Sequence, residues 1–247
     1  MEEFYKYNRT YHFPWSLGST SDDKFHGNTD AFIGMLTVTT EKMDGENTNM
    51  YPNRYHARSI DSRDHPSRSY VKQVWGKIKH EIPEGWRICG ENLYAEHSLP
   101  YDDLDAYFQV FSIWDENNMC LSWEDTEDIS KSLGLITVPV IHIGIYDEEY
   151  LKELASTMDL TKKEGYVTRN VKSFHFDDFI KNVGKFVRPR HITTDQHWME
   201  KAVVPNKLKE QRILCSIRPF DCAHYVHEHL CGLKETDCRY AKHPKNG

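Results

Sequence analysis

The interpretation of this sequence depends on one short segment, Glu41-Lys42-Met43-Asp44-Gly45-Glu46-Asn47. Residues 31–40, directly before it, are rich in β-branched side chains and predict a strand that ends just before Lys42. Gly45 permits a tight turn that would fold the chain back beside the lysine. A lysine is a nucleophile only when its surroundings lower its pKa and remove its proton. Lys42 is therefore a candidate nucleophile at the end of a strand, although Lys-x-Asp-Gly alone also fits an ordinary exposed turn.

The composition indicates a folded protein. The chain has 247 residues, a formal net charge of −7, 38% hydrophobic residues and 13% aromatic residues. This is enough apolar material for one large domain, and it excludes wholesale disorder. The acidic balance argues against a general polyanion binder but is compatible with a local basic groove. Basic residues gather between Arg54 and Lys79, a stretch that either contacts a polyanion or forms a solvated surface.

The sequence predicts a cytoplasmic protein without a membrane partner. No apolar run is long enough to cross a bilayer, and the first residues do not show a basic segment followed by an apolar one. The six cysteines are scattered without a disulfide-like framework, so we expect reduced thiols.

Hydrophobic patterning predicts an irregular mixture of strands and helices. Strands are predicted over residues 31–40, 86–94, 106–114, 136–145, 165–170 and 185–190, with a hairpin over 49–59. The apolar run 136–145 is expected to be a buried strand. Helices are predicted over residues 67–79, 125–133, 148–158 and 176–182, and mainly helical structure after residue 194. Because no repeating strand–helix–strand rhythm is present, we expect an α+β fold with mostly antiparallel sheets.

Five more segments follow Lys42 in an informative order. They are Ala57-Arg58-Ser59, Cys89-Gly90-Glu91-Asn92-Leu93, the run from Tyr107 to Asp115, the run from Lys163 to Arg169, and the run from Val183 to His191. In this order and at these separations the sequence resembles the covalent nucleotidyltransferase superfamily of RNA ligases, DNA ligases and mRNA capping enzymes. Within that superfamily it is most similar to ATP-dependent RNA ligases of the nick-sealing phage type. The resemblance covers roughly Tyr5 to Met199.

The resemblance gives the segment around Lys42 its expected roles. It implies that Lys42 attacks the α-phosphate of ATP and carries AMP, that Glu41 helps to read the adenine edge, and that Asp44 positions Lys42 or joins a metal network. Asn47 matches an asparagine that these RNA ligases carry after the nucleophile. Capping enzymes and most DNA ligases usually have arginine there, so Asn47 favours an RNA ligase.

The later segments imply contacts to the nucleotide. Arg58 resembles the arginine that contacts the nucleotide and the end being joined, and Glu91 resembles the carboxylate that accepts a hydrogen bond from the ribose. Phe111 stands at the position where family members have a phenylalanine that stacks on adenine. Stacking of a base on an aromatic ring stabilises binding by about 1–3 kcal/mol. Ser112 stands where the family usually has aspartate, and Asp115 is the nearest acid that could compensate.

The last two segments imply a metal and a phosphate site. Glu164 would hold Mg²⁺ or Mn²⁺, because hard cations prefer oxygen ligands and keep several waters, so that one or two carboxylates suffice. Lys185 resembles the lysine that grips the phosphates. The usual Lys-x-Lys spacing is not kept, so the second basic residue is either Arg188 or Arg190.

These resemblances imply an overall organisation and activity. Residues 1–199 would form a nucleotidyltransferase (adenylation) domain whose sheets flank an ATP cleft, and residues 200–247 a short, mainly helical tail. The chain would be an ATP-dependent RNA ligase of RNA repair that joins 5′-phosphate and 3′-hydroxyl ends through lysyl-AMP and an adenylated RNA end. We expect a monomer that acts on RNA, with an accessory repair protein as a further partner.

Three other functions fit the sequence less well. A capping guanylyltransferase would use GTP, and Asn47 disfavours it. A DNA ligase usually carries a further oligonucleotide-binding barrel, which the remaining residues hardly accommodate. A catalytically silent nucleotide-binding module is disfavoured by intact Lys42, Glu164 and Lys185. The sequence does not distinguish nicked duplex, single-stranded and tRNA substrates.

Two further segments have no assigned function. The cysteines and histidines of the tail show no Cys-x-x-Cys pair, so a packing tail is favoured over a zinc site. The segment from Tyr7 to His12 resembles the opening of the short RNA-ligase relatives, but the resemblance gives Arg9 no role, and a surface arginine explains it.

Overall fold

The computed structural model describes residues 3–17, 23–189 and 203–209. The chain divides into two units, Met1–Tyr101 with Ala106–Asn206, and Asp102–Asp105 with Lys207–Gly247. In the second unit, Lys209 Nζ lies 3.0 Å from the carboxylate of Asp105. All of the helices, strands and the pocket discussed below belong to the first unit.

The first sheet has five strands in the described part of the chain, in the spatial order β1-β12-β10-β2-β9. Their bounds are Tyr11–His12 for β1, Val183–Val187 for β12, Gly165–Asn170 for β10, Leu36–Lys42 for β2 and Val140–Ile145 for β9. Strands β1 and β12 run parallel, and the other neighbours run antiparallel.

The second sheet has seven strands among the described residues, with β8 attached to β6 beside the main order β11-β7-β6-β5-β3-β4. Their bounds are Phe174–His175 for β11, Met119–Cys120 for β7, Phe108–Trp114 for β6, Arg87–Asn92 for β5, Glu46–Met50 for β3, Tyr55–Ala57 for β4 and Ile136–Thr137 for β8. The predicted α+β fold with mostly antiparallel sheets is therefore confirmed.

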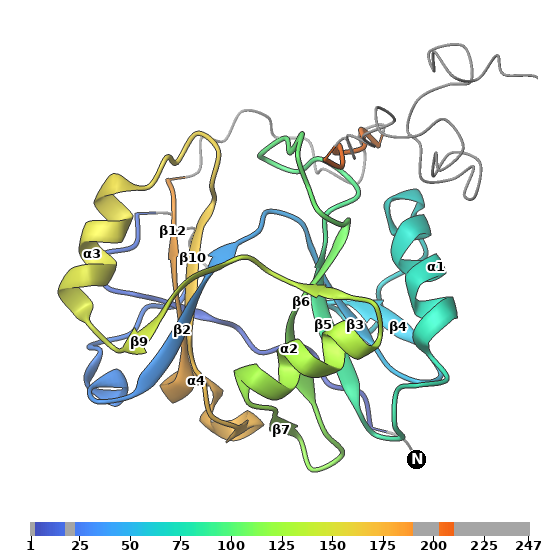
Figure 1. Ribbon diagram of the computed structural model, residues 1–247, viewed down its shortest axis with the longest axis horizontal. Coiled ribbons are helices and arrows are strands. Elements are labelled where there is room, and N and C mark those ends of the chain that lie inside the picture. The colour runs from blue at the N-terminus through green and yellow to red at the C-terminus, as the bar shows by residue number, and fades with distance from the viewer. Residues whose placement is uncertain (1–2, 18–22, 190–202, 210–247) are drawn as a thin grey trace, which may run out of the picture. The chain divides into compact units, whose positions relative to one another are not determined.

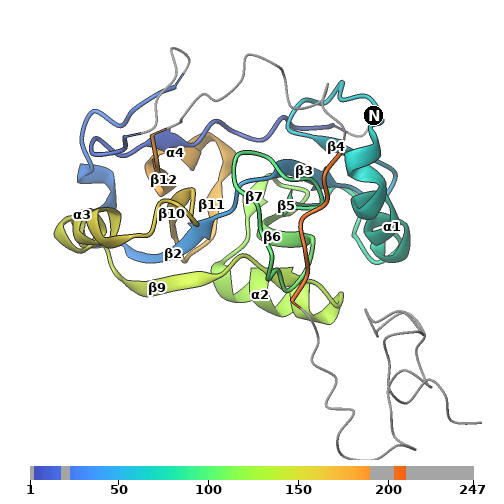
Figure 2. The same ribbon diagram turned by 90° about the horizontal axis from the view of Figure 1, so that it is seen from above.

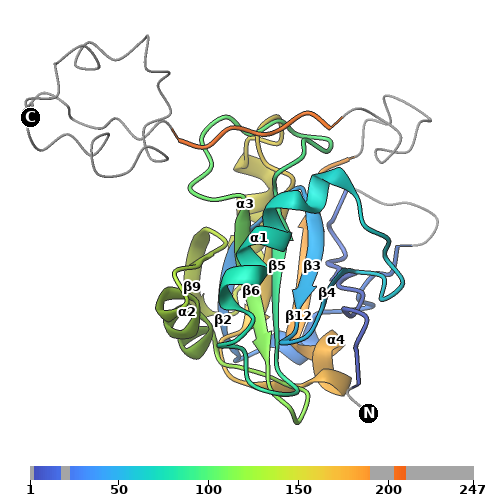
Figure 3. The same ribbon diagram turned by 90° about the vertical axis from the view of Figure 1, so that its right-hand side faces the viewer.

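Helices cover the outer faces of the two sheets (Figure 1). Helix α3, Glu148–Thr157, packs through Leu151 on an aromatic cluster of the first sheet that includes Tyr166 and Phe186. Helices α1, Ser69–Ile78, and α2, Trp123–Ser132, pack against the second sheet. Figure 3 shows α1 lying along β3, β5 and β6. The apolar stripes of these helices therefore bury one face of each sheet.

Short elements and helix caps complete the first unit. Single turns of 3₁₀ helix form at Asp30–Phe32, Pro66–Arg68 and Phe176–Asp178, and α4 spans Phe179–Asn182. The Ser122 hydroxyl caps α2 by accepting from Asp125 N at 3.1 Å, and Asp147 caps α3 by accepting from Tyr150 N at 3.1 Å. No helix in the described ranges is both long and apolar enough to cross a bilayer.

The prediction of one buried strand over 136–145 is wrong. The run is split by Pro139 into β8 and β9, because proline lacks the N–H that a continuous ladder needs. Strand β9 lies at the edge of its sheet, and Ile143 and Ile145 are 51% and 59% exposed. The hairpin at 49–59 and the four predicted helices are present, with shifts of a few residues at their ends.

The tail is described over residues 203–209, where the chain is extended rather than helical. Asn206 is buried, and its side chain donates to Leu93 O at 2.8 Å, which fixes residues 203–206 within the first unit. The predicted domain boundary at residue 199 and most of the predicted helical tail lie outside the described residues.

The chain crosses from the first sheet to the second directly after Lys42 (Figure 2). Lys42 is the last residue of β2, and Glu46 is the first residue of β3, so Met43, Asp44 and Gly45 make the whole connection. A Cβ atom on Gly45 would lie 2.5 Å from Asn92 O and 2.9 Å from Leu93 Cδ2. Gly45 is therefore required by the close approach of β5, a more specific reason than the tight turn predicted from the sequence.

Replacement of this glycine and of one in a helix should have opposite effects on stability. Gly45→Ala would overpack the crossing and should lower the free energy of unfolding by about 1–3 kcal/mol. Gly76 lies within α1, and nothing stands within 4 Å of its Cβ position. Gly76→Ala should raise the free energy of unfolding by about 1 kcal/mol, because alanine favours the helix. Urea denaturation checks both values, and a stabilised Gly45→Ala variant would contradict the packing described here.

Candidate active site

A pocket of about 760 Å³ surrounds Lys42 and is lined by residues of both sheets. This volume lies in the range of small-molecule sites in proteins. All but one of the site residues predicted from the sequence line it, namely Glu41, Lys42, Asp44, Asn47, Arg58, Glu91, Phe111, Glu164 and Lys185. The sequence motifs, which are spread over more than 140 positions, therefore converge on one pocket.

Strand register brings these residues together. In the first sheet, Gly165 pairs with Lys42, so Glu164 lies beside the end of β2, and Val167 pairs with Lys185. In the second sheet, Asn47 of β3 pairs with Glu91 of β5. The hydrogen-bonded ladders thus fix the strand residues within each sheet, whereas Asp44 and Arg58 reach the pocket from loops.

Two ion pairs cross between the end of β2 and the residues before β10. Lys42 Nζ lies 2.5 Å from Glu164 Oε2, and Lys163 Nζ lies 2.5 Å from Glu41 Oε2. Glu41 and Lys42 therefore each face a residue of opposite charge, Lys163 and Glu164 respectively. The Lys42 and Glu164 side chains are 24% and 8% exposed, so their pair is well shielded from solvent.

The carboxylates around Lys42 keep its ammonium group protonated in this state. Burial alone would lower the pKa of Lys42, but the negative charges of Glu164 and Glu91 outweigh it and raise that pKa above the ordinary lysine value. Lys42 can therefore act as a nucleophile only after the charge of these carboxylates has been offset.

Two further pocket residues have strongly shifted pKa values. Burial raises the pKa of Glu91 to about 8, although the positive charge of Lys42 opposes the shift. Burial, with the nearby charge of Lys42, lowers the pKa of Lys185 to about 8. Strongly perturbed groups that share one cleft are typical of functional sites.

Asp44 holds the turn that follows Lys42. Its Oδ2 accepts hydrogen bonds of 2.7 Å from Ser98 N, Ser98 Oγ and Leu99 N. Asp44 N donates to the Tyr101 hydroxyl at 2.9 Å. Of the two roles that the resemblance implied, these contacts favour the positioning of Lys42.

An apolar part of the pocket could hold a base. Phe111 and Val167 both line it, one from each sheet, and the Tyr7 ring packs edge-on against Phe111 with centroids 5.2 Å apart. Sequence reasoning missed Val167, although the alternation along the predicted strand 165–170 places it on the face of Arg169, another residue that lines the pocket.

Ser112, which stands where the family usually has aspartate, is buried. The Ser112 hydroxyl accepts from Trp114 Nε1 at 3.0 Å. Asp115 does not line the pocket, and its Oδ1 accepts from Asn117 N and Met119 N in the β6–β7 turn. Asp115 therefore does not compensate for Ser112.

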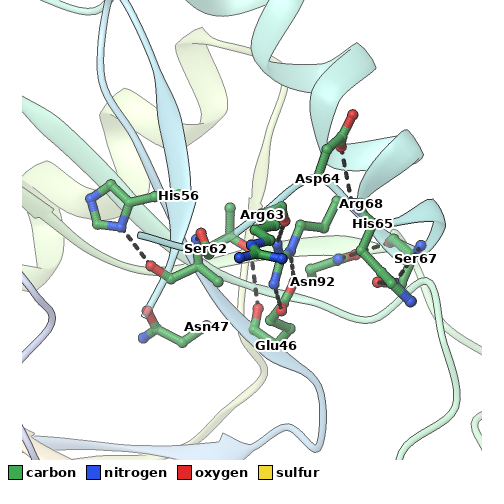
Figure 4. A network of polar contacts seen from close by, with 12 residues as sticks. Glu46, Asn47, His56, Ser62, Arg63, Asp64, His65, Ser67, Arg68 and Asn92 are labelled. Carbon is green, nitrogen blue, oxygen red and sulfur yellow. Dashed lines mark hydrogen bonds and ion pairs between the residues drawn. The ribbon is translucent and has the colours of Figure 1, made fainter. Parts of the chain in front are cut away.

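A buried ion pair fixes β3 to the loop that follows β4 (Figure 4). Arg68 Nε donates to Glu46 Oε2 at 2.7 Å, Arg68 Nη2 donates to Glu46 Oε1, and Arg68 Nη1 donates to Arg63 O. Arg68 and Glu46 are 5% and 9% exposed. Arg68 belongs to the basic stretch predicted from the sequence, but it is buried in this pairing with Glu46, a residue that lines the pocket, and does not line the pocket itself.

The structure does not bring Arg188 into the pocket. Its guanidinium donates to Leu160 O and Ser98 O, both at 3.2 Å, and it is absent from the lining of the pocket. The alternative, Arg190, lies outside the described residues. Lys185 and Arg58 are therefore the predicted phosphate-binding cations that the pocket contains.

The pocket also contains residues to which the sequence gave no role. Asn8, Arg9, Thr10 and Asp23 come from the N-terminal part of the chain, and His97 comes from the loop after β5. Asn8, Arg9 and Thr10 belong to the segment that resembles the opening of the short RNA-ligase relatives, but that resemblance gives them no role. No short motif marks Asp23 or His97, whose place depends on long-range packing.

The carboxylates present fit a divalent cation that is shared with a phosphate ligand. The described residues form no cluster of three or more metal-ligating side chains, so a site built wholly from protein ligands is not present there. Mg²⁺ is commonly bound by one or two carboxylates together with substrate phosphates and waters. Glu164, with its carboxylate directed at Lys42, fits such an arrangement.

The profile of the RNA ligase family matches residues 36–187, more than half of the chain, and includes Lys42, Glu91, Glu164 and Lys185. The chain belongs to the RNA ligase family. This confirms the resemblance drawn from the sequence motifs. No curated protein matches this RNA ligase family member.

Solved structures of ligases are similar to this RNA ligase family member at low identity. An archaeal ATP-dependent RNA ligase has 16% identity and a TM-score of 0.48, covering 71% of this chain and 48% of its own. Naegleria gruberi RNA ligase with pyrophosphate has 18% identity and a TM-score of 0.47, covering 64% and 51%. A candidate ATP-dependent DNA ligase from Aquifex aeolicus has 21% identity and a TM-score of 0.46, covering 64% and 45%. The chain thus spans about half the length of these proteins.

The Glu46–Arg68 pair should contribute far more to stability than an exposed pair nearby. Arg68→Met would leave the Glu46 carboxylate buried and unpaired, and should lower the free energy of unfolding by about 3–5 kcal/mol. Lys72 Nζ lies 3.4 Å from Asp64 Oδ2, with side chains that are 58% and 71% exposed. Lys72→Met should cost less than about 1 kcal/mol. Urea denaturation compares the two variants, and equal losses would contradict the role given to Arg68.

The affinity of the pocket for polyphosphate should fall as the pH rises through about 8. Lys185 then loses its positive charge while Glu91 gains a negative one. From about pH 7 to about pH 9 we expect metal-free pyrophosphate to bind at least about tenfold more weakly, the value of one charged hydrogen bond. Lys185→Arg keeps its charge and should show a smaller change. Calorimetric titration measures both, and the same pH dependence in both proteins would refute the assignment to Lys185.

Proposed function

We propose that this chain is an ATP-dependent RNA ligase that joins RNA 5′-phosphate and 3′-hydroxyl ends through a lysyl-AMP intermediate. The observation that supports this most is the position of Lys42. It lies where the chain crosses between the sheets, in a pocket of nucleotide size, with Glu164 at 2.5 Å. Family membership supports the same reaction class.

The nucleoside would lie in the apolar part of the pocket. Phe111 and Val167 come from different sheets and would contact the two faces of adenine. Glu91, which its raised pKa keeps largely protonated at neutral pH, can donate to or accept from a ribose hydroxyl. Glu41, held in place by Lys163, would face the adenine edge.

The first step forms the bond between Lys42 and AMP. The neutral Nζ of Lys42 attacks the α-phosphorus of ATP, and the new N–P bond forms. Pyrophosphate leaves with the electrons of the broken P–O bond, and the nitrogen releases one proton to solvent. Lys185 and Arg58 would neutralise the phosphate oxygens, because such transfers depend on positioning and on charge compensation. Mg²⁺ or Mn²⁺ held by Glu164 would supply further positive charge against the triphosphate.

The same pocket would serve the two later steps. A 5′-phosphate oxygen of RNA displaces Lys42 from AMP, and a 3′-hydroxyl then displaces AMP and closes the phosphodiester. Asn47 of β3 lines the pocket between Lys42 and Glu91, where it can hydrogen-bond an oxygen of either substrate. We propose that the chain acts on RNA as a monomer, with residues 1–199 as the adenylation domain.

Self-adenylation tests this proposal directly. Incubation with ATP labelled at the α-phosphate and Mg²⁺ should label the wild-type protein, and Lys42→Ala should abolish the label because the nucleophile is lost. Lys72→Ala, an exposed lysine outside the pocket, should label normally. Labelled GTP in place of ATP should give no band. An unlabelled wild-type protein, or a labelled Lys42→Ala variant, would refute the proposal.

The nucleic-acid substrate can be assigned with one labelled strand. A 5′-phosphate RNA presented alone, bridged by RNA and bridged by DNA separates single-stranded ligation from nick sealing. We expect sealing of RNA ends in at least one arrangement, and sealing of DNA ends alone would assign the chain to DNA instead.

A further inference from the structure

The loop that follows β5 holds the turn after Lys42. Three hydrogen bonds of 2.7 Å run from residues 98 and 99 of this loop to the Asp44 carboxylate. The hydroxyl of Tyr101, further along the same loop, accepts from Asp44 N at 2.9 Å. Asp44 stands two residues after Lys42, and both line the pocket. The position of the loop 93–101 therefore determines where the turn after Lys42 lies.

Asn206 is attached to both ends of the loop 93–101. It is 1% exposed. Its Oδ1 accepts from Tyr101 N at 2.8 Å, and its Nδ2 donates to Leu93 O at 2.8 Å and to Ala95 O at 3.3 Å. Leu93 opens the loop and Tyr101 closes it, so one amide group links its two ends.

The backbone around Asn206 runs beside the loop like an added strand. Asn206 N donates to Tyr94 O at 2.9 Å, and Val204 O accepts from Glu96 N at 2.8 Å. Asn206 and Val204 both follow the range 36–187 that the family profile matches. A segment outside the profile thus holds a loop beside the pocket.

A series of buried hydrogen bonds connects Asn206 with the turn. It runs from Asn206 Oδ1 to the backbone N–H of Tyr101, and from the Tyr101 hydroxyl to the backbone N–H of Asp44. Tyr101 and Asp44 are each 8% exposed, so water has little access to these groups. A buried polar group that loses its partner costs about 1–3 kcal/mol, and the structure would relax to avoid that cost. Removal of the Asn206 amide is therefore expected to shift Tyr101, and with it the turn at Asp44.

We propose that Asn206 is a positioning residue for the attack of Lys42 on ATP. The inference rests on the proposed function and extends it to a residue that does not line the pocket. Asn206 holds the loop 93–101, the loop holds Asp44, and Asp44 holds the backbone next to Lys42. Because it lies outside the pocket lining, Asn206 acts on the reaction only through these residues.

The residues proposed to bind the nucleoside are fixed by other contacts. Phe111 belongs to β6 and Glu91 to β5, and these two strands pair with each other along an antiparallel ladder. Loss of the Asn206 amide should therefore displace Lys42 more than the nucleoside contacts. Because the attack requires alignment of the reacting atoms, the rate of adenylation should fall while the affinity for ATP stays unchanged.

The experiment compares Asn206→Ala with Val204→Ala in the full chain. Val204 lies in the same segment and is 52% exposed. Formation of lysyl-AMP is followed in single turnover over a range of ATP concentrations with Mg²⁺. At saturating ATP, Asn206→Ala should react at least about tenfold more slowly than the wild type, since a displacement of about 1 Å costs roughly a hundredfold in rate. The half-saturating ATP concentration should not change, and Val204→Ala should match the wild type in both values.

Tyr101→Phe tests the middle of the series. It removes the hydroxyl that accepts from Asp44 N and keeps the backbone N–H that donates to Asn206. This variant should also react more slowly at an unchanged half-saturating ATP concentration. If Asn206 acts through Tyr101, the double variant should be slowed by less than the product of the two single factors, because the effects of coupled residues are not additive.

Three results would overturn the proposal. One is an Asn206→Ala protein that reacts at the wild-type rate, even with a lower melting temperature, since Asn206 would then serve stability alone. Another is an unchanged saturating rate with a raised half-saturating ATP concentration, which would assign Asn206 to nucleotide binding. The third is a double variant slowed by the full product of the single factors. If Asn206→Ala does not fold, Asn206→Ser, which retains one hydrogen-bonding group, replaces it with the same expectations.

Hydrogen–deuterium exchange separates this inference from the proposed function. The peptide that contains Asp44 should exchange faster in Asn206→Ala than in the wild type and in Val204→Ala, and unchanged exchange would refute the link between Asn206 and Asp44. Faster exchange in a protein that does not self-adenylate would retain that link and refute the ligase reaction. Self-adenylation at the wild-type rate in Asn206→Ala would retain the ligase reaction and refute the positioning role.

Discussion

The short connection between β2 and β3 is the constraint on which the site depends. The chain leaves the first sheet at Lys42 and enters the second at Glu46. Gly45 has no room for a side chain against β5, and Asp44 is fixed by three hydrogen bonds to residues 98 and 99. The backbone of Lys42 is therefore held at the junction of the two sheets, where side chains from both sheets can contact the same ligand.

Charge pairing then determines which groups are available for chemistry. Two of the carboxylates that line the pocket next to the crossing have cationic partners, Glu164 with Lys42 and Glu46 with Arg68. Buried charges of this kind are tolerated when they are paired and hydrogen-bonded. Because the Lys42–Glu164 pair holds Lys42 as an ammonium ion, the proposed attack by Lys42 requires that substrate binding change the electrostatic environment of the pair.

The sequence predicted the centre of the pocket better than its walls. Lys42, Glu91, Glu164 and Lys185 could be found because each lies in a short motif that resembles the family, and each lies on or directly beside a paired strand. Asp115 and Arg188 belong to a turn and to a strand end outside those ladders, and neither lines the pocket. The partner of Arg68 and the position of Arg9 depend on contacts between distant loops, which local patterns do not encode. The prediction of one buried strand at 136–145 is wrong for a different reason, since apolar residues of this run belong to an exposed sheet edge.

The central claim is that Lys42 forms a covalent bond to the α-phosphorus of ATP. Mass spectrometry of peptides from protein incubated with ATP and Mg²⁺ tests it most directly, because it identifies the modified residue. We expect one adenylyl group, on the peptide that contains Lys42. An adenylyl group on Lys163 or Lys185, with Lys42 unmodified, would contradict it.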